Sequence, residues 1–396
     1  MITVGKCRQG SENVQFEFAT AGQIVFGWGR ISELGQRTQA FGKRVLLVTG
    51  SRPQRTESIQ ERLRTVGADV ATFSIATEPT TSLVQAGVEC ARDHGADWVL
   101  GIGGGSVLDS AKAIAALVPN PGEIFEYLEV VGRGQDLVRA SLPCVAVPTT
   151  SGTGSEVTKN AVLHATDHGV KVSLRGLGLL PRIALVDPEL TVSLPADITA
   201  ATGLDALTQV IEPYVSLARG PMTDALCLEG MRRIAASIRR AYTNGNDRNA
   251  RENMATASLF GGLALANARL GAVHGFAAPL GGLCGAPHGA ICARLLPLVM
   301  RTNLKFARKM NQADLIARFT QIAKTLTGLS DVKAEDGITW LDTLVTDLGI
   351  QRLGSFGIAP SQVDLLVQQS RKASSMRGNP VELPSDALAA ILHDAI

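Results

Sequence analysis

Short runs of consecutive apolar residues mark the first half of the chain. They give predicted strands over 44–49, 68–73, 97–102, 144–148 and 183–187, some with a polar residue at an end, and 68–73 also contains Asp69 and Thr72. Segments with the apolar and charged spacing of helices follow the first three runs, at 56–66, 81–94 and from the glycines after 102 to about 118. Runs that are apolar at every position are typical of strands buried on both faces of a parallel sheet. This alternation predicts an α/β fold with a doubly wound, Rossmann-like parallel sheet.

From about residue 196 the pattern changes to long segments with apolar positions at a spacing of about 3.6 residues. These segments are rich in Ala, Leu, Arg and Gln and cover 196–216, 221–242, 248–268, 287–300, 309–326, 333–348, 360–372 and 384–395. We therefore expect an α/β domain over residues 1–190 and an all-α helical domain over 191–396. Pro188 and Pro195 bracket the expected connection.

Composition narrows the classes of partner. The formal net charge of the 396 residues is +2, basic residues are scattered, and aromatic residues make up 4%. This argues against nucleic acid or a membrane surface as the main partner. No apolar run approaches the roughly 20 residues of a membrane helix, and residues 1–6 lack a signal-peptide core. The six cysteines form no Cys-x-x-Cys pair and are expected to be reduced, mostly buried thiols of a cytoplasmic protein.

Four polar residues in the helical half are candidate metal ligands. Asp205 and Gln209 are four residues apart, so both project from one face of the expected helix. His274 and His288 each lie in a glycine-rich apolar stretch. Together these side chains offer two imidazole nitrogens, a carboxylate and an amide oxygen, which suits a divalent cation. Cys284 and Cys292 flank His288, and either could lie near the site or simply pack.

Two glycine-rich loops in the α/β half are candidate phosphate and nucleotide contacts. The sequence Gly-Ile-Gly-Gly-Gly-Ser at 101–106 follows a strand and opens a helix, where free backbone amides and the helix dipole favour an anion. A tight turn without a ligand is the alternative. The loop Pro-Thr-Thr-Ser-Gly-Thr-Gly-Ser-Glu at 148–156 follows another strand. Two such loops at the carboxyl ends of parallel strands predict a dinucleotide crevice.

These segments, together with five others, resemble the iron-containing (group III) alcohol dehydrogenases over nearly the whole chain. The matching segments are 103–112, 148–156, 179–188, 200–208, 271–275, 287–289 and 378–380. The resemblance implies an alcohol dehydrogenase, or an aldehyde or ketone reductase, that transfers hydride between nicotinamide C4 and a metal-polarised oxygen. It also implies a small alcohol or aldehyde substrate, NADP or NAD, a divalent Fe²⁺ or Zn²⁺ ion, and a homodimer.

The resemblance assigns the metal to Asp205, Gln209, His274 and His288, with Asp205 and the two histidines catalytic. This chain departs from the family pattern twice, because Gln209 stands where the family usually has His, and Ala278 stands where a second His often follows. Three interpretations of Gln209 are open: a weaker metal ligand, a packing or substrate-binding residue beside a three-ligand metal, or a mark of a lost metal site.

The predicted cofactor contacts lie after the strands of the α/β half. They are Gly50, Ser51, Arg52, Gly103, Gly104, Gly105, Ser106, Asp109, Thr149, Thr150, Thr153, Ser155 and Lys171. The family often has an aspartate at position 50 that binds the ribose hydroxyls, and Gly50 with nearby arginines favours NADP over NAD. Asp109 and Lys112 are interpreted either as ribose or phosphate anchors or as surface charges.

Two alternatives to the dehydrogenase remain from the sequence. A lyase similar to dehydroquinate synthases would use the nucleotide only for transient redox. A nucleotide-binding protein without metal-dependent catalysis would explain the two missing imidazoles.

Overall fold

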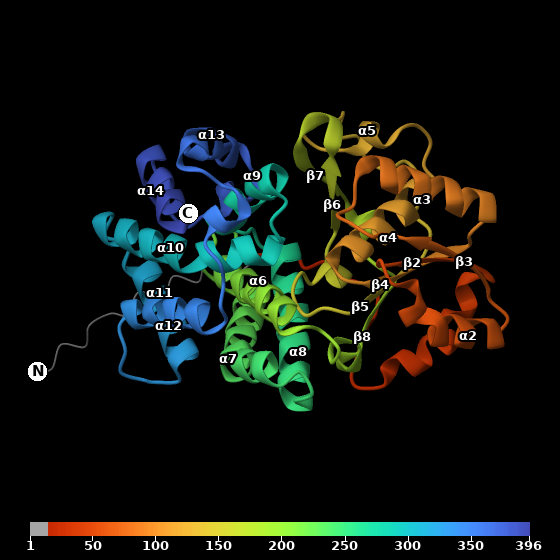
Figure 1. The fold of residues 1–396 in the computed structure, drawn as a ribbon, viewed down its shortest axis with the longest axis horizontal. Coiled ribbons are helices and arrows are strands. Elements are labelled where there is room, and N and C mark those ends of the chain that lie inside the picture. The colour runs from red at the N-terminus through yellow and green to blue at the C-terminus, as the bar shows by residue number, and fades with distance from the viewer. Residues whose placement is uncertain (1–14) are drawn as a thin grey trace, which may run out of the picture.

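The computed structural model describes residues 15–396, which form an α/β half and a helical half lying side by side (Figure 1). The six parallel strands of the α/β half are β1 (Ile24–Phe26), β2 (Arg44–Thr49), β3 (Asp69–Ser74), β4 (Trp98–Gly103), β5 (Cys144–Pro148) and β8 (Ile183–Val186). Its helices are α1 (Leu34–Thr38), α2 (Glu57–Thr65), α3 (Thr81–His94), α4 (Gly105–Leu117) and α5 (Ile124–Tyr127).

The strand order β1-β8-β5-β4-β2-β3 places β4 on the opposite side of β2 from β3. The connection after β2 leads to β3 on one side, whereas the connection after β4 leads to β5 on the other, so the crevice between the carboxyl ends of β2 and β4 is a topological switch point. In the register, Thr49 pairs with Ile102 and Gly103 pairs with Pro148. The loops after β2, β4 and β5 consequently begin at the same edge of the sheet.

Both faces of the inner strands β2, β4, β5 and β8 are buried, as their apolar residues predict, whereas the edge strand β3 is partly exposed. In β2, Leu46 and Val48 belong to a core that includes α3 and α4. Val45 and Leu47 belong to a second core, which includes α1 and α2. This arrangement confirms the predicted doubly wound sheet. All five predicted strands are present, with bounds within one residue of those expected.

An antiparallel hairpin, β6 (Asn160–Ala165) and β7 (Val170–Arg175), was not predicted. Its buried residues alternate with exposed ones, and it packs on α4 beside the sheet rather than within it. Short alternating strands bounded by polar residues give a weaker sequence signal than the continuous apolar runs. The hairpin forms one wall of the cavity described below.

The helical half contains α6 (Ala196–Val215), α7 (Pro221–Thr243), α8 (Arg248–Asn267), α9 (Ala272–Cys284), α10 (His288–Lys309), α11 (Ala313–Thr327), α12 (Ala334–Asp347), α13 (Val363–Lys372) and α14 (Ser385–Ala395). The central helix α6 packs against α7, α8 and α10. Leu204, Leu207 and Val210 of α6 are fully buried in the main core of this half.

Helix α9 was missing from the predicted helices, and α10 runs farther than the predicted 287–300. The α9 sequence contains Gly275, Pro279 and Gly281, which have low intrinsic helix propensity. Burial of Val273, Phe276 and Leu280 in the core compensates for that propensity. Tertiary packing therefore decides this helix.

The described cysteines, Cys90, Cys144, Cys227, Cys284 and Cys292, are free thiols. Cys7 and the expectation about the first six residues lie outside the described part of the chain. Among residues 15–396, we find no helix long and apolar enough to cross a membrane.

Candidate functional site

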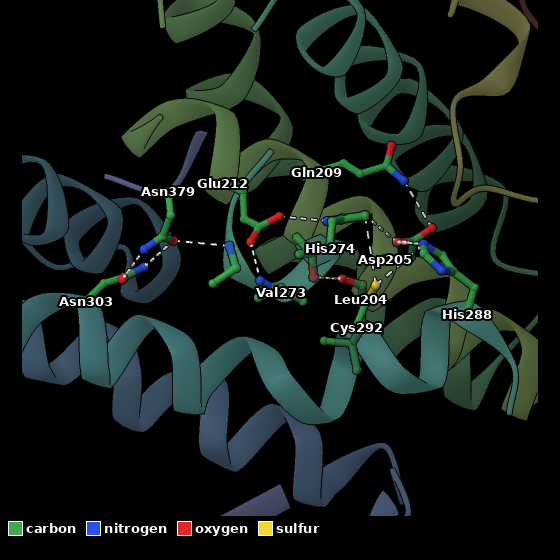
Figure 2. Close-up of polar contacts among 12 residues, drawn as sticks. Leu204, Asp205, Gln209, Glu212, Val273, His274, His288, Cys292, Asn303 and Asn379 are labelled. Carbon is green, nitrogen blue, oxygen red and sulfur yellow. Dashed lines mark hydrogen bonds and ion pairs between the residues drawn. The ribbon is translucent and has the colours of Figure 1, made fainter. Parts of the chain in front are cut away.

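Three helices of the helical half bring the predicted metal ligands together. Asp205 and Gln209 lie one turn apart on α6, His274 lies in the first turn of α9, and His288 is the first residue of α10 (Figure 2). The sequence separates these residues by as many as 83 positions, 205 to 288. Folding of the helical core therefore creates the site.

Close packing between the starts of α6 and α10 positions His288. A Cβ atom on Gly289 would lie 2.4 Å from the carbonyl oxygen of Ala201, so only glycine allows this approach. Gly285 ends α9 with a φ of 63°, a left-handed conformation that favours glycine, and lets the chain turn into α10. Gly285 thus allows the turn between the two histidines, and Gly289 allows the helix contact directly after His288.

The polar atoms of the cluster converge on one point. Asp205 Oδ1 lies 3.5 Å from His274 Nε2 and 3.7 Å from His288 Nε2. The two imidazole rings are 5.4 Å apart between centroids. Asp205 is 2% exposed, and its Oδ1 atom has no hydrogen-bond partner among residues 15–396. A buried carboxylate oxygen without a partner is costly, so the cluster has the character of a cation site.

A second buried carboxylate, Glu212, orients His274. Its Oε2 atom accepts a hydrogen bond from His274 Nδ1 at 2.7 Å, and its Oε1 atom accepts one from the Val273 backbone at 2.7 Å. Since an ionised carboxylate only accepts, Nδ1 carries the hydrogen, and His274 would present its Nε2 lone pair to a metal ion that replaces the Nε2 proton. Sequence reasoning missed Glu212, although its position seven residues after Asp205 places it on the same helix face.

Asn379 supports the start of α9. Its Oδ1 atom accepts hydrogen bonds from the Ala272 backbone at 3.1 Å and from Asn303 Nδ2 at 3.1 Å. Asn379 Nδ2 donates in return to Asn303 Oδ1 at 2.8 Å. The Gly-Asn-Pro segment at 378–380 thus contributes to the site through α9 (Figure 2).

Gln209 contacts the cluster through its amide nitrogen. Gln209 Nε2 donates to Asp205 Oδ2 at 3.1 Å, while the buried Oε1 atom has no partner in the described chain. Cys292 also reaches the cluster, with Sγ 3.6 Å from His288 Nε2 and 3.9 Å from His274 Nε2. Of the two cysteines that flank His288, Cys292 thus lies at the cluster, whereas Cys284 Sγ donates to the Leu280 carbonyl. The role of Gln209 as a ligand stays a prediction.

The pKa shifts of Asp205 and His274 indicate that the cluster favours positive charge. Burial disfavours the charged form of Asp205, but His288, His274 and Gln209 outweigh it and lower the pKa of Asp205. Burial likewise disfavours protonated His274, but Cys292, Asp205 and Glu212 raise its pKa well above the ordinary value. A metal ion would take the place of protons here.

The donor set fits a divalent transition metal. One atom each from Asp205, His274, His288 and Cys292 lies within 4.8 Å of the others. Carboxylate oxygen, imidazole nitrogen and thiol sulfur are donors that such ions take, and Asp205 Oδ1 is free to bind.

A cavity of about 1380 Å³ connects this cluster to the α/β half. Gln209, His274, Ala278 and His288 line one part of it, and Ser106 lies at another. Of the predicted cofactor contacts, the lining includes Gly105, Ser106, Asp109, Thr153, Ser155 and Lys171. The volume exceeds the roughly 300–1,000 Å³ of an ordinary small-ligand site, so the cavity has room for a dinucleotide and a substrate.

The predicted contacts at the edge of the sheet form a second group. Gly50, Ser51, Arg52, Gly103, Gly104, Thr149 and Thr150 surround the switch point but are not in the cavity lining. The Thr149 amide donates to the Gly103 carbonyl at 2.9 Å, which joins the two loops.

Loop packing explains part of the glycine pattern. A Cβ atom on Gly105 would lie 2.7 Å from the Thr153 side chain, and one on Gly103 would lie 2.5 Å from Val107. Gly104 precedes α4 and provides no side-chain cap. The first amides of α4 thus keep the arrangement that favours an anion.

Asp109 and Lys112 hold the second loop in place. Asp109 Oδ1 accepts from Ser155 Oγ at 2.5 Å, and its Oδ2 accepts from the Val162 backbone at 2.9 Å. Lys112 is 1% exposed and donates to the carbonyl oxygens of Ser155 and Asn160. The surface-charge interpretation of Lys112 is therefore wrong, because its ammonium group binds the loop from inside.

Lys171 lies on the hairpin and faces the cavity. Its Nζ atom pairs with Glu78 Oε1 at 2.7 Å, and its side chain is 9% exposed. The ion pair links β7 to the start of α3. The predicted cofactor contact of Lys171 stays a prediction.

Two family models match the two halves of the chain. The model described as iron-containing alcohol dehydrogenase matches residues 21–188. The model described as Fe-containing alcohol dehydrogenase family, C-terminal, matches residues 199–396.

Characterised relatives match almost the whole chain. It is 36% identical to a 1,3-propanediol dehydrogenase of Klebsiella pneumoniae, over 96% of this chain and 98% of that protein. It is 38% identical to long-chain-alcohol dehydrogenase 1 of Geobacillus thermodenitrificans, over 87% and 88% of the two chains. A crystal structure of a 1,3-propanediol oxidoreductase superposes with a TM-score of 0.89, at 35% identity, covering 96% of this chain and 100% of that one. The chain therefore belongs to the iron-containing alcohol dehydrogenase family of alcohol oxidoreductases.

Proposed function

We propose that this protein is a metal-dependent, NAD(P)-linked alcohol dehydrogenase that also reduces aldehydes or ketones. The convergence of Asp205 Oδ1 with the Nε2 atoms of His274 and His288 carries the proposal. This cluster borders the same cavity as the first turn of α4. A metal ligand set and an anion-binding helix start therefore lie along one continuous space.

The side chains of the cluster would bind a divalent ion and present it to the cavity. His274 and His288 line the cavity, whereas Asp205 lies behind them. Glu212 holds His274 with its Nε2 atom toward the cluster. When bound, the ion would polarise the alcohol or carbonyl oxygen, and the nicotinamide would accept or supply the hydride.

The α/β half would bind the dinucleotide across the switch point. We propose the loops after β2, β4 and β5 as its contacts, with the first turn of α4 at the pyrophosphate. Gly50 ends β2 without a carboxylate, and a Cβ atom there would meet no atom closer than 4.0 Å. Arg52 and Arg55 are exposed nearby. This supports NADP over NAD, since nothing at position 50 repels a 2′-phosphate.

The substrate is proposed to be a small alcohol or aldehyde. Ala278 lies one turn after His274 and lines the cavity. A methyl group at this place leaves more room than an imidazole would, so we expect a substrate with bulk on this side of the metal.

Two assays test the proposal. Protein purified without chelator should contain close to one divalent ion per chain and should oxidise NADPH faster than NADH with an aldehyde panel. EDTA should abolish this activity, and added Fe²⁺ or Zn²⁺ should restore it. Activity that survives in metal-free protein would contradict metal dependence, and a metal-loaded protein inactive with every carbonyl would contradict the dehydrogenase.

The cofactor preference has a separate test. Gly50→Asp should lower kcat/KM for NADPH much more than for NADH, because a carboxylate would repel the 2′-phosphate and bind ribose hydroxyls. Gly50→Ala is the matched control, since it adds only the methyl group. An unchanged ratio of the two kcat/KM values in Gly50→Asp would place the adenosine elsewhere.

Two further proposals concern the assembly and the cellular compartment. The family resemblance supports a homodimer, which light scattering during gel filtration would test. The free thiols of the five described cysteines support a reducing, cytoplasmic compartment. Cell fractionation would test the compartment.

A further inference from the structure

Cys292 is the fourth potential donor in the cluster of Asp205, His274 and His288, whereas the family resemblance implies Gln209 as the fourth ligand. Cys292 lies on α10 one turn after His288, so both side chains project from the same helix face. Its side chain is fully buried, and Sγ lies 3.6 Å from His288 Nε2 and 3.9 Å from His274 Nε2. The sulfur thus faces the same point as both imidazoles.

A second observation indicates that a cation belongs at this point. Asp205 Oδ1, on a buried side chain, is aimed at the same space and lacks a hydrogen-bond partner in the described chain. The Glu212 carboxylate turns the His274 Nε2 atom toward it as well. One ion would satisfy the oxygen, both nitrogens and the sulfur together.

Gln209 is arranged for a different role. Its Nε2 atom donates to Asp205 Oδ2, so the amide holds the carboxylate with Oδ1 toward the cluster. The amide oxygen points away from the cluster, as Figure 2 shows. It lies 3.6 Å from the place of a Cβ atom on Gly261, on the α8 side. Gln209 is therefore a positioning residue for Asp205.

We propose that Cys292 Sγ is the fourth protein ligand of the metal, with Asp205, His274 and His288, and that Gln209 orients Asp205. This inference rests on the proposed metal dependence. As the ion binds, the thiol proton leaves to solvent and the sulfur binds as thiolate. Two anionic ligands then balance the two charges of the ion.

The ligand set also predicts which metal is preferred. A thiolate is a soft donor, and sets of sulfur and imidazole favour Zn²⁺ or Co²⁺ over Fe²⁺. Asp205 and Cys292 are not in the cavity lining, whereas both histidines are. The sulfur thus binds from the protein side and leaves the cavity side to substrate.

Cobalt spectroscopy tests the proposal without relying on activity. The full-length metal-free protein is loaded with Co²⁺ alone, and the near-ultraviolet sulfur-to-cobalt charge-transfer band is recorded. The band should appear in the unmodified protein and in Gln209→Ala. It should vanish in Cys292→Ser, and Zn²⁺ affinity of this variant, measured against a chromophoric chelator, should fall at least about tenfold.

Cys284→Ser is the matched control. Cys284 lies four residues before His288, but its Sγ atom donates to the Leu280 carbonyl within its own helix. This variant should keep both the band and the Zn²⁺ affinity. Equal unfolding temperatures of metal-free Cys292→Ser and metal-free unmodified protein should show that the variant folds.

Several results would overturn the inference. They are bound Co²⁺ without a sulfur band, a band that persists in Cys292→Ser, and no binding of Co²⁺ at all. Bound Co²⁺ without the band, in a protein that still shows metal-dependent NADPH oxidation, would leave the proposed function intact. The band in a protein inactive with every carbonyl would support the ligand set and contradict the dehydrogenase.

Discussion

At the scale of single residues, the hydrogen bond between Glu212 and His274 sets the orientation of the His274 ring in the cluster. The carboxylate fixes which imidazole nitrogen bears the hydrogen and so which one is free to bind. Such partners are often as important as the ligands themselves.

Glu212→Gln should weaken metal binding by about 10- to 100-fold. The glutamine oxygen can still accept from the Val273 backbone, but its NH₂ group cannot accept the His274 Nδ1 hydrogen. Zn²⁺ competition with a chromophoric chelator measures the change. The control is Glu229→Gln, which removes the two ion pairs of Glu229 with Arg232 and Arg233 on α7. Equal affinities in the unmodified protein and Glu212→Gln would show that other contacts orient His274.

A buried carboxyl in the second glycine-rich loop should make stability depend on pH. Glu156 is 2% exposed, and burial raises its pKa from 4.5 to about 7, with Lys112 opposing the shift. Below pH 4.5 the carboxyl is protonated in both folded and unfolded protein. As the pH rises from 4.5 through about 7, the unfolded state releases the proton first, and the folded state loses stability.

Glu156→Gln should therefore raise the free energy of unfolding at pH 8 by up to roughly 3 kcal/mol, from 1.36 kcal/mol per pKa unit. At pH 5 it should have little effect. Urea unfolding at both pH values measures the difference. An equal change at both would indicate altered packing rather than ionisation.

At the scale of elements, the crossing of α6 and α10 sets the distance between Asp205 and His288. The backbone of Ala201 occupies the space of any side chain at position 289. Interior packing is dense, so the helices cannot absorb an extra methyl group without moving apart.

Gly289→Ala should thus lower metal affinity several-fold and reduce stability by about 1–3 kcal/mol. Calorimetric Zn²⁺ titration and urea unfolding measure the two effects. Gly220→Ala offers a control, since a Cβ atom there would meet no atom closer than 4.0 Å. Unaltered Zn²⁺ affinity in Gly289→Ala would mean that His288 adjusts independently of its helix.

At the scale of the whole molecule, the proposed metal site and most proposed dinucleotide contacts lie in different halves. The proposed metal ligands come from α6, α9 and α10, whereas the proposed dinucleotide contacts come mainly from loops at the sheet edge. The cavity joins them. Metal and dinucleotide should therefore bind with little dependence on each other.

Removal of the metal should leave cofactor affinity within about a factor of three but lower the unfolding temperature. A ligand that binds only the folded protein stabilises it by about 2.7 kcal/mol when its free concentration is roughly 100 times Kd. Fluorescence titration measures the affinity for NADPH, and calorimetric scanning measures the unfolding temperature, each with and without EDTA. Loss of NADPH binding in metal-free protein would reveal coupling between the halves.

The pattern of apolar and polar residues within single segments predicted much of the fold of this protein. Apolar runs predicted the inner strands β2, β4, β5 and β8, because burial on both faces leaves few polar positions, and the partly exposed β3 was also predicted, whereas β1 has only three residues and was not. The i and i+4 spacing of Asp205 and Gln209 predicted a shared helix face, because helical geometry is local. The loop at 101–106 and the family motifs predicted the two proposed binding regions, which stay predictions.

Tertiary structure decided what depends on contacts between distant segments. Helix α9, with its glycines and proline, is stabilised by the core rather than by its own propensity. The pairing of Glu212 with His274, the burial of Lys112 beneath the second loop, and the approach of Cys292 Sγ to both histidines arise where separate helices or loops meet. Spacing along the chain predicts which residues share a helix or strand. Only packing between elements determines which side chain completes the proposed metal site.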